Sequence, residues 1–249
     1  MIDFQNVSFS YGEESSGGGI RNVNLTINTG EFVLLTGESG CGKTTITRLV
    51  NGLVPHYYEG NLEGDVLLDG KSVSDTPLYD LAAMVGSVFQ NPKSQFFNVD
   101  TDSELAFACE NLGYPQEDIL KRIDRTVSDY HIEDLMGRSV FALSGGEKQK
   151  IACASSSVLL PGIMVLDEPS SNLDMAAIDD LRQVLSLWKK QGKTILIAEH
   201  RLYYLHDLAD RVLYVKDGEI EREYTPAEFD SLSDSTRKEM GLRPVSLSK

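Results

Sequence analysis

The most informative stretch of this sequence is Gly37-Glu38-Ser39-Gly40-Cys41-Gly42-Lys43-Thr44-Thr45. It follows an apolar run at residues 32–36 and precedes a segment whose apolar residues recur at helical spacing. The expected order is therefore strand, glycine-rich loop and helix. Glycines let the backbone wrap around an anion, Lys43 adds a charge for the β and γ phosphates, and the Thr44 hydroxyl can hold Mg²⁺. This pattern predicts a nucleoside triphosphate site.

The composition excludes several classes of protein. At 249 residues the chain has the size of one large domain, or of one domain with a helical insertion. It carries 38 acidic and 23 basic residues, a formal net charge of −15. Such a surface would repel a phosphate backbone, so we expect no nucleic-acid partner. The three cysteines, Cys41, Cys109 and Cys153, match neither a disulfide framework nor a zinc site.

The sequence gives no sign of a membrane span or a secretion signal. No apolar run approaches the roughly eighteen residues of a spanning helix. The first residues, Met1-Ile2-Asp3-Phe4, lack the basic and apolar pattern of a signal peptide. We therefore expect a soluble protein located in the cytoplasm.

The N-terminal region predicts an antiparallel sheet beside the nucleotide core. Apolar residues alternate over 2–11, with one slip, and again over 23–27, and a turn rich in serine and glycine at 13–19 joins the two stretches. Tyr11 closes the first strand. An aromatic ring there could stack on a nucleotide base or could be a packing residue, and its position does not decide between them.

Polar side chains follow three apolar runs, at the point where each predicted strand ends. The runs and their following residues are 84–89 with Gln90, 163–166 with Asp167 and Glu168, and 195–198 with His200. Ligands bind at the carboxyl ends of strands in α/β sheets. A carboxylate pair in this position can complete an Mg²⁺ shell and polarise water. Taken singly, each of these residues could equally belong to an ordinary loop.

A helical pattern dominates residues 101–157. Within it, Leu143-Ser144-Gly145-Gly146-Glu147 precedes a helix and offers a second site where backbone N–H groups can bind an anion. By itself this is also a plain capped helix start. A terminal hairpin is predicted around Asp217-Gly218. The tail 225–249, with Pro226, Pro244 and many Ser and Asp residues, shows no clear element.

These motifs and their order along the chain resemble the nucleotide-binding domain of ATP-binding-cassette (ABC) proteins, and the resemblance covers nearly the whole chain. The family's Walker A motif falls on residues 37–45, its signature on 143–147 and its Walker B motif on 163–167. Its D-loop falls on 170–174. Glu147 stands where many members have glutamine, and Lys148 and Lys150 stand where arginines are frequent. These departures leave the backbone donors of the signature unchanged.

The resemblance implies an α/β fold: a P-loop NTPase core with a mixed sheet, an N-terminal antiparallel β subdomain and a helical insertion. It implies a single ABC ATPase domain over 1–249. Its expected parts are a nucleotide-binding core at 1–95 and 160–224, the insertion with the signature at 96–159, and a C-terminal tail at 225–249. ATP would lie between two such domains, with the Walker A motif of one facing the signature of the other.

The resemblance also assigns roles to single residues, with ATP and Mg²⁺ as cofactors. The expected catalytic residues are Glu168, His200 and Gln90. The expected Mg²⁺ ligands are Thr44, Gln90 and Asp167. The expected nucleotide-binding residues are Tyr11, Gly37, Glu38, Ser39, Gly40, Cys41, Gly42, Lys43, Thr44, Thr45, Ser144, Gly145, Gly146 and Asp174.

Two loops, at 89–97 and 198–205, look most like the ATPases of energy-coupling-factor (ECF) importers, which take up vitamins and transition metals. The resemblance then implies a peripheral position on the inner face of the cell membrane. The implied partners are a second ABC ATPase domain, as a homodimer, a heterodimer or the other half of a longer protein, and a transmembrane subunit that docks near residues 90–102, from Gln90 to Asp102. Alternatives are the ATPase of an exporter, a soluble cassette that acts on DNA or ribosomes, and a P-loop kinase.

Apolar residues in the docking segment could serve either of two purposes. Phe96, Phe97 and Val99 lie in an otherwise polar stretch. They either contact the membrane subunit or pack beneath the helical insertion, and surface exposure distinguishes the two.

Overall fold

The computed structural model describes residues 1–12 and 18–242, so the turn predicted at 13–19 falls largely outside the described residues. Its strands form a four-stranded sheet in the order β2-β1-β4-β5 and a six-stranded sheet in the order β10-β9-β3-β8-β7-β6. The smaller sheet is antiparallel and is built from β1 (Ile2–Tyr11), β2 (Gly19–Ile27), β4 (Gly60–Leu68) and β5 (Lys71–Ser72).

The larger sheet carries the nucleotide loop. It is parallel except at the edge strand β10. Its strands are β3 (Phe32–Thr36), β6 (Val85–Val88), β7 (Ile163–Asp167), β8 (Thr194–Ala198), β9 (Arg211–Lys216) and β10 (Glu219–Tyr224). In β3, Phe32 and Leu34 pack into one apolar layer, and Val33 and Leu35 into the layer on the opposite face. Because both faces are covered, the strands read as continuous apolar runs.

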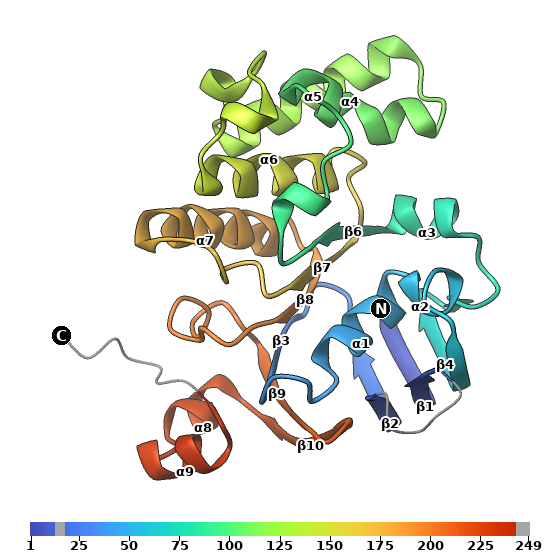
Figure 1. Cartoon of the computed structure of the whole chain (residues 1–249), viewed down its shortest axis with the longest axis vertical. Coiled ribbons are helices and arrows are strands. Elements are labelled where there is room, and N and C mark those ends of the chain that lie inside the picture. The colour runs from blue at the N-terminus through green and yellow to red at the C-terminus, as the bar shows by residue number, and fades with distance from the viewer. Residues whose placement is uncertain (13–17, 243–249) are drawn as a thin grey trace.

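The helices lie in separate groups (Figure 1). Helix α1 (Lys43–Val50) lies between the two sheets, followed by the short helices α2 (Leu53–His56) and α3 (Leu78–Met84). Helices α4 (Thr101–Asn111), α5 (Gln116–Tyr130) and α6 (Gly145–Ser157) gather at one end of the molecule. Helix α7 (Met175–Lys190) packs against α6 on the side of the larger sheet. This arrangement is the predicted mixed α/β fold with a helical insertion.

A buried polar network joins the insertion to α7. The indole nitrogen of Trp188 donates to the Tyr130 hydroxyl, which also shares a hydrogen bond with the Ser157 hydroxyl. All three side chains are buried. Burial raises the pKa of Tyr130, so its hydroxyl keeps the proton it needs as a donor. The network therefore holds α5, α6 and α7 in one packed unit.

The C-terminal tail contains two short helices that the sequence did not predict. Helices α8 (Pro226–Asp230) and α9 (Asp234–Glu239) lie near β9 and β10. The Tyr214 hydroxyl donates to the backbone oxygen of Met240 at 3.1 Å, which fixes the end of α9 to β9. The remaining tail, 243–249, lies outside the described residues. No helix in the described part of the chain has both the length and the apolar character needed to cross a bilayer.

Candidate functional site

The loop between β3 and α1 has a backbone that requires glycine at two positions. Gly37 and Gly42 have φ values of 146° and 111°. A Cβ atom at Gly37 would lie 2.1 Å from the Val215 carbonyl oxygen, and one at Gly42 would lie 2.9 Å from the Gly19 carbonyl oxygen. The loop is therefore pressed against its neighbours while Glu38, Ser39 and Gly40 remain exposed on its outer side.

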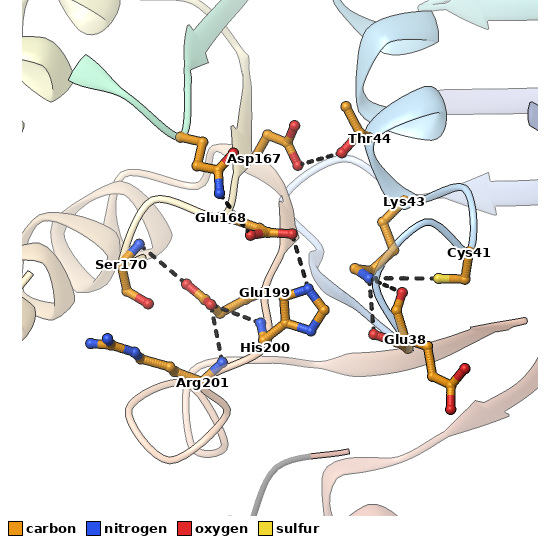
Figure 2. Close-up of polar contacts among 12 residues, drawn as sticks. Glu38, Cys41, Lys43, Thr44, Asp167, Glu168, Ser170, Glu199, His200 and Arg201 are labelled. Carbon is orange, nitrogen blue, oxygen red and sulfur yellow. Dashed lines mark hydrogen bonds and ion pairs between the residues drawn. The ribbon is translucent and has the colours of Figure 1, made fainter. Parts of the chain in front are cut away.

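Lys43, the first residue of α1, folds back across this loop (Figure 2). Its Nζ donates to the carbonyl oxygens of Gly37 at 2.9 Å and Glu38 at 2.8 Å, and lies 3.5 Å from Cys41 Sγ. The residue is buried. Its ammonium group thus lies inside the loop that would surround the negatively charged phosphates.

Thr44 and Asp167, two of the three residues expected to bind Mg²⁺, lie side by side. Thr44 Oγ1 lies 3.1 Å from Asp167 Oδ1 at the end of β7. Burial is the main reason that the pKa of Asp167 is raised. A cation beside this carboxylate would act in the opposite direction and favour its charged form. The described residues contain no group of three or more His, Cys, Asp and Glu side chains that could hold a metal. A hydroxyl and a carboxylate are oxygen donors of the kind that Mg²⁺ prefers, so the pair fits an ion that takes its other ligands from phosphate and water.

Glu168 connects the carboxyl ends of three neighbouring strands (Figure 2). Its Oε2 accepts from Gln90 Nε2 at 3.0 Å, and its Oε1 lies 2.9 Å from His200 Nε2. Its own φ is +45°, an uncommon value for a residue other than glycine. The chain therefore brings together the three residues expected to be catalytic. Gln90 is directed to Glu168 in this structure, and no hydrogen bond within the described residues joins it to Thr44 or Asp167.

Tyr11 lies beside the loop, within a cluster that the sequence did not reveal. Its hydroxyl lies 3.2 Å from Thr45 Oγ1 and accepts from Arg48 Nη1 at 3.0 Å. The Arg48 guanidinium also lies over the ring of Tyr58, 4.1 Å from its centroid. Arg48 was missed because only its spacing within the helix, and not its direction, can be read from the sequence. Base stacking by Tyr11 stays a prediction.

The signature residues 144–146 line a different hollow, of about 410 Å³, together with Asn172 and Asp174. None of the residues 37–45 is among its described lining. Ser144 caps α6 by accepting from the backbone of Glu147 at 3.3 Å, while Glu147 accepts from the backbone of Ser144, and this contact lowers the Glu147 pKa. The Asp174 carboxylate accepts from the backbone of Ala177 and caps α7. The structure thus separates this hollow from the Lys43 site.

The two signature glycines differ in their surroundings. A Cβ at Gly145 would meet no atom nearer than 4.0 Å, the Asn172 carbonyl oxygen. A Cβ at Gly146 would lie 2.8 Å from the Cβ of Ala177. Gly146 is therefore required for packing α6 against α7, whereas the space at Gly145 is open to a group from outside the chain.

The family model for ABC transporters matches residues 20–171, which is more than half of the chain. The chain belongs to the ABC transporter family. It is an ABC ATPase domain, or cassette, a class of domain that binds ATP with Mg²⁺ as the usual cofactor.

The sequence relatives carry corresponding names. Two proteins of Treponema denticola, both named as ABC transporter ATP-binding proteins, are 47% and 42% identical to the cassette over 98% and 99% of its length. The cassette spans 50% of the length of each. A protein of Pyrococcus abyssi with a similar name is 40% identical over 92% of the cassette and 81% of its own length.

Solved structures share the fold. The cassette resembles cbiO1 from Clostridium perfringens, which is part of the ABC transporter complex cbiONQ, with a TM-score of 0.81 and 27% identity over 95% of this chain and 93% of that one. It resembles the ATP-binding cassette MJ0796, in a dimeric post-hydrolysis state bound to ADP and phosphate, with a TM-score of 0.77 and 26% identity over 91% and 99% of the two chains. These likenesses confirm the predicted fold class.

Proposed function

We propose that the cassette hydrolyses ATP at an interface with a second cassette and thereby drives an ECF-type importer. The observation that carries this proposal is the separation of two incomplete sites on one chain. Lys43, Thr44, Asp167 and Glu168 form one site, and the signature residues 144–146 form another hollow. A second cassette, from another copy, another subunit or the same polypeptide, would complete both.

In the proposed mechanism the chain's own residues bind, orient and polarise. Lys43 would contact the β and γ phosphates, and Thr44 and Asp167 would hold the metal. When bound, Mg²⁺ would neutralise charge on the transferring phosphate. Glu168 would orient the attacking water, with its carboxylate held by Gln90 on one oxygen and His200 on the other.

The importer assignment rests on the two loops noted in the sequence and on the likeness to cbiO1. That protein belongs to a transporter complex. We infer that the cassette likewise works with a membrane subunit, on the inner face of the membrane, and that the cargo is a vitamin or a metal ion. Copurification with a membrane protein and solute uptake by the reconstituted complex test this assignment.

The trans role of the signature gives a prediction for Gly145. Gly145→Asp should leave ATP binding to the isolated cassette within about twofold of wild type, because the site near Lys43 does not include it. It should reduce the ATPase rate of the complete complex by about 100-fold, since a carboxylate would oppose phosphate at the helix N-terminus. Nucleotide titration of the monomer and a phosphate-release assay of the complex measure the two effects.

Gly162 provides the matched control for this variant. Its position is also open, because a Cβ there would have no neighbouring atom within 4 Å, and it lies before β7. Gly162→Asp should keep wild-type turnover. If Gly145→Asp weakens ATP binding by the monomer as much as Lys43→Ala does, the signature does not serve the nucleotide of another cassette.

The exposure of the apolar residues after Gln90 separates two roles within that segment. Phe96 packs against the core of the larger sheet, whereas Phe97 is 75% exposed and stacks on Phe107, with ring centroids 4.9 Å apart. Val99 is 64% exposed. We call the stacked pair Phe97 and Phe107 the aromatic patch. The exposed ring of Phe97 supports docking of a membrane subunit at this patch, whereas the core contacts of Phe96 favour a packing role.

We therefore predict different results for two neighbouring substitutions. Phe97→Ala should keep basal ATPase activity and the melting temperature, yet abolish copurification with the membrane subunit and solute uptake. Phe96→Ala should lower stability by about 1–3 kcal/mol, because it removes partly buried apolar surface. Thermal melts and pull-downs of both variants provide the comparison. Wild-type complex formation by Phe97→Ala would exclude the aromatic patch as the docking surface.

A further inference from the structure

Glu199 is a buried carboxylate without a role in the proposed chemistry. It follows β8 directly and is 1% exposed. None of the ion pairs within the described residues includes it. Burial of a carboxylate is costly unless hydrogen bonds replace its water. Glu199 therefore needs hydrogen-bond donors from the protein.

Four donors surround this carboxylate (Figure 2 shows three of them). Its Oε1 accepts from the backbone N–H groups of His200 at 2.7 Å and Arg201 at 3.0 Å. Its Oε2 accepts from the Tyr204 hydroxyl at 2.8 Å and from the backbone N–H of Ser170 at 3.3 Å. One oxygen therefore holds the loop that carries His200, and the other reaches the start of the loop at residues 170–174.

Arg201 makes a second connection between the same two loops. Its Nη1 donates to the Leu173 carbonyl oxygen at 3.0 Å, and its Nη2 lies 3.4 Å from the Ser171 carbonyl oxygen. Glu199 and Arg201 thus flank His200 in sequence and both contact residues 170–173. One does so by accepting from a backbone N–H, and the other by donating to backbone carbonyls.

We propose that Glu199 and Arg201 are positioning residues that hold His200 and the 170–174 loop as one rigid unit. This inference rests on the proposed function, in which His200 acts beside Glu168 and a second cassette completes the hollow that residues 172–174 line with the signature. His200 is already 2.9 Å from Glu168. A displacement of the 170–174 loop at that interface would then move the imidazole that contacts the Glu168 carboxylate.

Glu199→Gln tests this connection with little change in volume. A glutamine offers one acceptor oxygen, which can keep the N–H groups of His200 and Arg201. Its NH₂ group would then face the N–H of Ser170, and two donors cannot bond. We expect hydrogen exchange in the peptide 169–174 of the nucleotide-free cassette to quicken by about tenfold or more.

The same variant should also slow catalysis without weakening substrate binding. In the complete complex, kcat should fall by about 10- to 100-fold, since small misplacements of catalytic groups have effects of this size. KM for ATP should remain near wild type, because the hydrogen bonds of Glu199 within the described residues do not involve Lys43 or Thr44. Unchanged exchange at 169–174, or wild-type kcat, would overturn the proposal.

Asp207→Asn is the matched control in the same region. Asp207 pairs with Arg182 at 2.5 Å and joins the segment after His200 to α7. Within the described residues, its hydrogen bonds do not reach His200 or residues 170–174. It should leave kcat and exchange at 169–174 unchanged. If Asp207→Asn changed kcat and exchange at 169–174 as much as Glu199→Gln does, any loss of packing in this segment would have the same effect. The positioning role of Glu199 would then be overturned.

Arg201→Leu keeps the test available if Glu199→Gln does not fold. It retains the backbone N–H that Glu199 accepts from and removes both side-chain contacts to the 170–174 loop. The same rise in exchange and the same fall in kcat are expected. In the double variant the two effects should be less than additive, because both act on one connection. Exchange needs neither ATP nor a partner, so inactivity of the wild-type complex would refute the proposed function and leave this inference still measurable.

Discussion

Glu168→Gln should reduce ATP hydrolysis by about 100-fold or more while ATP binding survives, since a positioned general base contributes this much. Glu168 Oε2 accepts from Gln90 and Oε1 contacts His200. The amide of glutamine is neutral, so the variant loses the negative charge. An amide also has one acceptor oxygen in place of two, so its NH₂ group would face Gln90 or His200. The water would be neither polarised nor held in place. Phosphate release by the complex measures the rate.

Unhydrolysed ATP should also stabilise the assembled state of this variant. Size-exclusion chromatography with ATP and the proper partner should then show a persistent dimer of cassettes. Glu117→Gln is the control, because Glu117 is an exposed carboxylate on α5 that pairs with Lys121. It should hydrolyse ATP at the wild-type rate. Hydrolysis by Glu168→Gln at that same rate would remove Glu168 from the mechanism.

Lys43→Ala should weaken ATP binding by about 10- to 100-fold and abolish turnover, because charge-assisted hydrogen bonds to phosphate contribute about 1.5–3 kcal/mol. The structure adds a second cause. Lys43 Nζ donates to the carbonyl oxygens of Gly37 and Glu38, so its removal also deletes two hydrogen bonds that hold the loop in the shape seen in this structure. Calorimetric titration with ATP and Mg²⁺ measures the loss.

Cys41→Ala is the control for Lys43→Ala, because it leaves both of these causes in place. Cys41 Sγ is the most distant partner of Lys43, at 3.5 Å, and the substitution leaves the carbonyl contacts in place. We expect ATP affinity within about threefold of wild type, as for the loss of one weak contact. Normal turnover in Lys43→Ala would show that the glycine-rich loop is not the phosphate site.

The sequence predicted those parts of the site whose signals are local. The glycine-rich loop shows its own strand, turn and helix, and Asp167, Glu168 and His200 each follow an apolar run at a strand end. Because parallel strands end at one edge of a sheet, their proximity followed from topology. The fold class was predicted from the resemblance of these ordered motifs to the ABC family, and the likeness to solved ABC structures confirms it.

Contacts between distant segments could not be predicted in this way. Glu199 reaches Ser170 across 29 positions, and Tyr11 reaches Arg48 across 37. The direction of each side chain depends on how loops pack after the sheet has formed. The sequence around Glu199 does not show whether its carboxylate is buried or solvated, because the groups that donate to it are known only from the structure.

Two parts of the fold were missed although local signals exist. Helix α7 was not predicted, yet Ile178, Leu181, Leu185 and Trp188 recur at helical spacing and are buried. Helix α8 begins with a capping box between Thr225 and Glu228. The many Ser and Asp residues around it obscured that signal, because the same residues are common in turns.

The close approach of Gly146 to Ala177 has a consequence for how this family can vary. A Cβ at position 146 is compatible with the observed backbone only if the Cβ at position 177 is absent. Changes at the two positions should therefore show epistasis: a substitution at 146 is harmful beside alanine and tolerated beside glycine. Position 145 has no such dependence on the rest of the chain. Mutational tolerance at the two adjacent glycines should therefore reflect different selective pressures. The pressure on Gly146 comes from packing within the fold, and the pressure on Gly145 comes from a group outside the chain.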